Sequence, residues 1–114
     1  MREASRLIRR VHNVSGIAPY DICNVADVGD APVNPIDLHR SISMIEEFFA
    51  RIHAAGVLPL SIGGDHTVPL PILRALARDR PVGIFHIDSH ADTLDTLADT
   101  RINHATTFRR GVEE

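Results

Sequence analysis

Two short, nearly uninterrupted apolar runs, at residues 57–62 and 82–87, constrain the fold of this chain more than any other feature. An apolar run of this length without alternating polar residues is typical of a strand covered on both faces, as in a parallel sheet. The segment between the runs can hold one crossover helix. Residues 57–87 are therefore predicted to form a right-handed β-α-β unit within an α/β fold.

Apolar residues spaced three and four positions apart predict the helices. One helix begins at Asn34 and Pro35, which suit the N-cap and the first turn, and Gly56 ends it. Its apolar face carries Leu38, Ile42, Ile45, Phe49 and Ile52. A second helix is expected over residues 68–78, with its two prolines in the first turn, and another begins after residue 104. A further short strand is expected at residues 21–26.

Composition excludes several functional classes. The net charge of -3 and the lack of aromatic residues among basic ones exclude a nucleic-acid partner. A membrane partner is not expected, because no apolar run approaches the ~20 residues that span a bilayer. All 12 basic residues are Arg, which excludes Schiff-base and P-loop lysines. The single Cys23, predicted to be a small core residue, cannot form an internal disulfide, which favours a cytoplasmic location.

Polar clusters follow both apolar runs. Asp65 and His66 come after the first run, and Asp88, His90 and Asp92 alternate after the second. Because the carboxyl ends of neighbouring parallel strands converge, we expect these side chains to lie close together. Carboxylates and imidazoles without thiolate suit Mn²⁺, Fe²⁺, Co²⁺ or Zn²⁺. The alternative is a solvated acidic loop with ordinary capping residues.

The two clusters resemble the two metal motifs of the ureohydrolase family, which includes arginase, agmatinase and guanidinobutyrase. The motifs are Gly-Gly-Asp-His at 63–66 and Asp-Ser-His-Ala-Asp at 88–92. Residues 24–30, 32–35 and 103–110 also resemble agmatinase-type sequence, so the resemblance covers essentially the whole chain. It points to the agmatinase and guanidinobutyrase branch.

The resemblance implies a three-layer α/β/α domain with a parallel sheet and two Mn²⁺ per active site. Such a centre hydrolyses a linear, agmatine-like guanidino compound to urea and an amine through a metal-bridging hydroxide. Carried over by position, His66 binds one ion and His90 the other, while Asp88 and Asp92 bridge them. His104 matches the histidine that protonates the departing amine. The resemblance also implies a homo-oligomer for the full-length protein.

Other residues near the motifs receive lesser assignments. His86 is predicted to be a satisfied core residue, and Asp65 to orient His66 or the glycine turn. Asp95 is expected to cap a turn rather than line the substrate entrance. Ala105 stands where the family usually has glycine, so a positive φ there would strain the backbone.

We expect residues 1–114 to be a single partial ureohydrolase domain, truncated at both ends. The family's later Ser-Phe-Asp-x-Asp motif, which supplies two further aspartate ligands, has no match after His104. One alternative is therefore a catalytically incomplete metal-binding or oligomerising fragment. Another is a mononuclear iron oxygenase with two histidines and one aspartate, although the usual setting of that class is a β-barrel.

Overall fold

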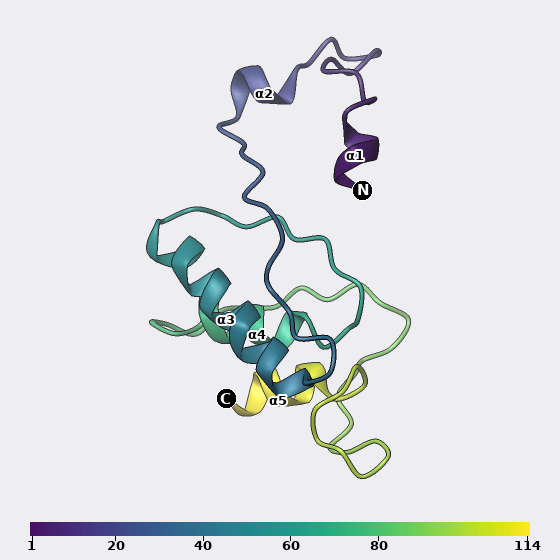
Figure 1. Cartoon of the computed structure of the whole chain (residues 1–114), viewed down its shortest axis with the longest axis vertical. Helices are drawn as coiled ribbons and strands as arrows, with labels where there is room; N and C mark the ends of the chain where they lie inside the picture. Colours follow the sequence, from purple (N-terminus) through teal and green to yellow (C-terminus); the bar gives the residue numbers. More distant parts are fainter. The chain divides into compact units, whose positions relative to one another are not determined.

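The computed structural model describes all residues from Met1 to Glu114 and divides them into two compact units, Met1–Asp30 and Ala31–Glu114. Figure 1 shows helices joined by long irregular segments, without a sheet. None of the helices combines the length and the apolar character that crossing a membrane requires. The prediction of one partial domain over 1–114 stays a prediction.

The unit Met1–Asp30 contains two single-turn helices, α1 (Arg2–Ser5) and α2 (Pro19–Ile22). None of its residues is buried. The strand expected at residues 21–26 is wrong, because Pro19 has its φ preset for a first helical turn and the helix that follows includes Ile22. Cys23 is exposed, so its assignment to the core is also wrong.

The unit Ala31–Glu114 contains α3 (Leu38–Ala54), α4 (Pro69–Leu76) and α5 (Thr107–Glu113). All three expected helices form, and Gly56 follows α3 with a φ of 68°. The predicted N-cap of α3 is wrong by three residues. Asp37 is the cap, because its carboxylate accepts from the backbone N–H of Arg40 at 2.9 Å. Asn34 instead accepts from the N–H groups of Ile36 and Asp37 in the turn before the helix.

The core lies between α3 and α4, which cross in Figure 1. Ile45 and Phe49 of α3 pack with Ala75 of α4, and Leu70 of α4 is fully buried. Ile45 and Phe49 lie on the apolar face of α3 that the sequence periodicity predicts. The loop that carries His66 connects these two packed helices, so the core fixes both ends of that loop.

Neither apolar run forms a strand, and no backbone hydrogen bond joins residues 57–62 to residues 82–87. Leu60 and Phe85 are 96% and 91% exposed. The predicted burial of both runs is therefore wrong for this structure. The physical reason is that backbone pairing between only two extended segments contributes too little free energy to hold them together. A buried sheet is stabilised by further strands and by the layers that cover it. The parallel sheet stays a prediction.

Candidate metal centre

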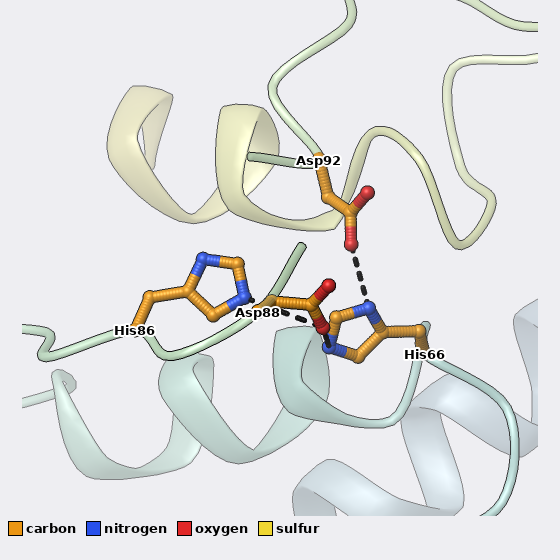
Figure 2. A group of neighbouring side chains, drawn as sticks. All are labelled: His66, His86, Asp88 and Asp92. Atoms are coloured by element: carbon orange, nitrogen blue, oxygen red, sulfur yellow. Dashed lines mark ion pairs between the residues drawn. The ribbon is translucent and has the colours of Figure 1, made fainter. Parts of the chain in front are cut away.

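Four side chains from two distant parts of the chain converge on one small volume (Figure 2). They are His66, which precedes α4, and His86, Asp88 and Asp92, which follow or end the second apolar run. Each offers one nitrogen or oxygen atom, and these atoms all lie within 4.8 Å of one another. The structure thus brings together three of the four predicted metal ligands, His66, Asp88 and Asp92.

The imidazole of His66 lies between two carboxylates, as Figure 2 shows. Its Nδ1 is 2.6 Å from Oδ2 of Asp92, and its Nε2 is 3.9 Å from Oδ2 of Asp88. The Asp92 side chain is only 11% exposed. Asp92 also has a φ of 49°, an uncommon conformation for a residue with a side chain. The loop therefore adopts a restricted backbone geometry at the residue that faces His66.

The carboxylate of Asp88 has imidazoles near both of its oxygens. Oδ2 faces His66 and His86, the latter at 3.8 Å from Nε2. Oδ1 accepts from the backbone N–H of His90 at 3.0 Å and lies 3.8 Å from Nδ1 of the same residue. The N–H of His90, with the nearby His66 and His86 rings, lowers the pKa of Asp88, so this group is a carboxylate at neutral pH.

The first turn of α5 anchors the segments that carry His66 and Asp92. The Thr107 hydroxyl donates to the carbonyl of His66 at 2.8 Å. The backbone N–H of Phe108 donates to the carbonyl of Asp92 at 3.1 Å. The N–H groups of a first helical turn lack partners within the helix, so the Asp92 carbonyl satisfies one of them. A helix remote in sequence thereby fixes two candidate ligands.

His86 lies in the converging group, so its prediction as a satisfied core residue is wrong. Its side chain is 25% exposed and its Nε2 points toward Asp88 (Figure 2). The signal was available in the sequence, because His86 precedes Asp88 by two residues and so has the same parity. The apolar surroundings of His86 in the sequence outweighed that signal.

His90 and His104 lie outside the group of four. The side chain of His90 is 80% exposed, although its Nδ1 stays close to Asp88. His104 is exposed on the segment that precedes α5. The roles carried over for both histidines stay predictions.

Asp65 stabilises the turn before α4. Its carboxylate accepts from the Thr67 hydroxyl and, at 2.8 Å, from the Thr67 backbone N–H. These two bonds, and then the charges of His104 and His66, lower the pKa of Asp65. Ala105 does not have a positive φ, so the strain considered for that position does not arise.

The donor set fits a divalent first-row ion. Two carboxylates and two imidazoles without a thiolate suit Mn²⁺, Fe²⁺, Co²⁺ or Zn²⁺. The carboxylates of Asp88 and Asp92 lie next to imidazoles, so both residue types can bind the same ion. No Arg forms an ion pair with Asp88 or Asp92, so their charge is not neutralised by a basic side chain.

Comparison with known proteins relates the whole chain to one family. The model of the Arginase family matches residues 1–114. The chain is 57% identical to a guanidinopropionase and 46% identical to a guanidinobutyrase, both of Pseudomonas aeruginosa. Each match covers 100% of this chain and 36% of the relative, so the chain spans about a third of their length.

A solved structure gives the same relationship in three dimensions. The proclavaminate amidinohydrolase of Streptomyces clavuligerus superposes with a TM-score of 0.82 at 31% identity. The match covers 98% of this chain and 38% of that chain. The path of the chain is therefore similar to that of an enzyme of this fold, even though residues 57–62 and 82–87 lack strand pairing here.

Proposed function

Because this chain belongs to the arginase family, we propose that it carries out, within its whole protein, the hydrolysis of a linear guanidino compound to urea and an amine. The observation that carries the proposal is the convergence of His66, Asp88 and Asp92, with donor atoms within 4.8 Å of one another. The names of the guanidinopropionase and guanidinobutyrase relatives support the same reaction class.

The proposed cofactor is a pair of Mn²⁺ ions. His66 would hold one ion, His90 would hold the other, and the carboxylates of Asp88 and Asp92 would hold both. For Asp88 this is supported by its two oxygens, which lie near different imidazoles. When bound, such a pair would act as a Lewis acid and would activate water as a nucleophile near neutral pH.

Each protein residue then has a limited task. Asp88 and Asp92 bring negative charge to a site that must hold cations, and the lowered pKa of Asp88 keeps that charge at neutral pH. His66 is fixed by the Thr107 hydroxyl through its carbonyl. His104 is proposed to deliver a proton to the departing amine, because an imidazole is a common general acid.

The substrate is proposed to carry a carboxylate at the end remote from its guanidinium group. The two relatives at 57% and 46% identity are named for guanidino acids, guanidinopropionate and guanidinobutyrate. The agmatine-like amine expected from the sequence remains the comparison compound. The chain itself is proposed to be a partial domain of a cytoplasmic homo-oligomer.

A second candidate is a metal-binding unit without turnover. It is favoured by the size of the group, since four donor atoms within 4.8 Å suit one ion better than two. Under this candidate the chain binds a single Mn²⁺ and produces no urea.

Urea release tests the proposal. The Mn²⁺-loaded protein is incubated with 3-guanidinopropionate, 4-guanidinobutyrate or agmatine, and urea is measured beside the variant His104→Asn. The proposal expects urea from a guanidino acid, with a clear loss in the variant. Metal binding without urea from any of the three compounds would reject hydrolysis and favour the second candidate.

A further inference from the structure

The ring of Phe108 contacts both histidines of the candidate metal centre. Its centroid lies 4.0 Å from that of His86, with the planes tilted by 39°. It lies 5.6 Å from that of His66, in an edge-to-face arrangement with an interplanar angle of 75°. The His66 separation lies within the range of about 4.5–7 Å that attractive aromatic pairs favour, and the rings of Phe108 and His86 are in still closer contact.

The backbone of Phe108 is fixed by the same site. Its N–H donates to the carbonyl of Asp92 at 3.1 Å, and the neighbouring Thr107 hydroxyl holds the carbonyl of His66 at 2.8 Å. The ring therefore projects from a backbone position tied to two candidate ligand segments.

His86 in particular needs such support, because little else orients its ring. His86 lies in a segment without strand pairing, and the ion-pair geometry recorded for its ring is to Asp88 at 3.8 Å, longer than a hydrogen bond. A freely rotating imidazole would spend much of its time with Nε2 away from the carboxylates. Stacking on Phe108 restricts that rotation.

We propose that Phe108 is a positioning residue, which holds the rings of His66 and His86 in the orientation that faces Asp88 and Asp92. It touches neither substrate nor metal and acts through the two imidazoles. This inference rests on the proposed function only for its consequence, metal binding. The ring orientation itself is a property of the metal-free chain.

The chain supplies a matched control. Phe48 makes a comparable edge-to-face contact with Phe49, at 5.5 Å and 72°, within α3 and away from the site. Phe48→Leu removes an aromatic ring of the same size from a partly buried position. Phe108→Tyr retains the ring at the site and serves as the conservative variant.

The first measurement uses metal-free chain with carbon-13-labelled histidine and phenylalanine rings. Nuclear Overhauser contacts are expected between the Phe108 ring and the rings of both His66 and His86. In Phe108→Leu the His86 ring protons should shift downfield, because the ring current of the stacked phenyl group is lost. Absence of these contacts in the unsubstituted chain would overturn the proposal without any need for a variant to fold.

The second measurement is calorimetric titration with Mn²⁺. Phe108→Leu is expected to weaken Mn²⁺ binding by about 10–100-fold, the usual effect of losing a partner that orients a ligand. Phe108→Tyr and Phe48→Leu should bind Mn²⁺ like the unsubstituted chain, even if Phe48→Leu melts at a lower temperature. Equal affinity of Phe108→Leu and the unsubstituted chain would overturn the proposal.

The two measurements distinguish a failure of the proposed metal centre from a failure of the proposed role of Phe108. If the unsubstituted chain binds no Mn²⁺, the metal centre proposed for this chain fails, and the metal-free spectra alone decide the role of Phe108. Histidine resonances that change in Phe108→Leu but not in Phe48→Leu then support positioning. Resonances that stay the same in both variants reject it.

Discussion

Nδ1 of His66 lies 2.6 Å from Oδ2 of Asp92, although one residue precedes α4 and the other lies beyond the second apolar run. The two meet because the first turn of α5 bonds to both backbones, through Thr107 to His66 and through Phe108 to Asp92. The contact therefore depends on a third segment.

Replacing Asp92 by Asn should weaken Mn²⁺ binding strongly, because a charged ligand is lost. The loss should exceed the effect of about 10–100-fold that follows when a residue supporting a metal ligand is replaced. The matched control is Asp99→Asn, since Asp99 also has a positive φ, of 60°, and Asn tolerates that conformation. Calorimetric titration of both variants measures the effect. Equal losses in both would mean that loop geometry, rather than the Asp92 carboxylate, controls binding.

Replacing Thr107 by Val should lower the free energy of unfolding by about 1–3 kcal/mol, because the carbonyl of His66 loses its hydroxyl donor inside the structure. Thr107 is 1% exposed, so water cannot readily replace the hydroxyl. Thr107→Ser keeps the donor and should retain most of the stability. Chemical denaturation compares the three proteins, and a Val variant as stable as the Ser variant would show that this hydrogen bond contributes nothing.

The buried core and the exposed apolar run predict different effects for the same substitution. Leu70→Ala should lower the free energy of unfolding by about 2–5 kcal/mol, because Leu70 is 0% exposed in the α3–α4 core. Leu60→Ala should change it by less than about 0.5 kcal/mol, because Leu60 is 96% exposed. Urea denaturation tests both. A large loss in Leu60→Ala would indicate that the 57–62 run is covered in solution.

The ion pair of Asp95 with Arg110 should make stability depend on pH. Arg110 is buried and its Nη2 lies 2.6 Å from Oδ1 of Asp95, and this bond lowers the pKa of Asp95 below its ordinary 3.8. Because the pKa of Asp95 is lower in the folded than in the unfolded chain, the ion pair stabilises the fold at pH values above the ordinary pKa. This stability is lost as the pH falls through the lower folded pKa. Asp95→Asn should therefore melt at a lower temperature than the unsubstituted chain at pH 7.

The same difference in melting temperature should shrink as the pH falls below about 3.8, the ordinary pKa, and through the lower folded pKa, where Asp95 becomes protonated in the folded chain. Asp99→Asn, which removes an exposed carboxylate, serves as the control. Thermal melts followed by circular dichroism at several pH values give the comparison. A constant difference between Asp95→Asn and the unsubstituted chain at every pH would contradict the assigned ion pair.

The helices of Ala31–Glu114 could be predicted from the sequence because their signals are local. The apolar spacing from Leu38 to Ile52 and the prolines at the start of α4 act within one or two turns. The N-cap of α3 was misplaced because Asn34 and Asp37 are both suitable caps. Only the backbone geometry determines which one accepts from a first-turn N–H.

The strands could not be predicted reliably from the same kind of signal. An apolar run such as residues 82–87 indicates a segment that would be buried on both faces. A sheet also needs neighbouring strands, however, and here no backbone hydrogen bonds pair this run with residues 57–62. For the site, the motifs predicted that His66, Asp88 and Asp92 would lie close together, and the structure brings them together. They did not predict that the rings of His86 and Phe108 would lie beside this group, because that contact depends on where α5 packs.

The most direct test of the account is equilibrium dialysis of the chain against Mn²⁺, beside the variant Asp88→Asn. Asp88 is the carboxylate with imidazoles at both oxygens, so its replacement should affect every ion that the site holds. We predict saturable Mn²⁺ binding by the unsubstituted chain and its loss in Asp88→Asn. Absence of saturable binding, or binding that is the same in the variant, would contradict the assignment of His66, Asp88 and Asp92 as a metal centre.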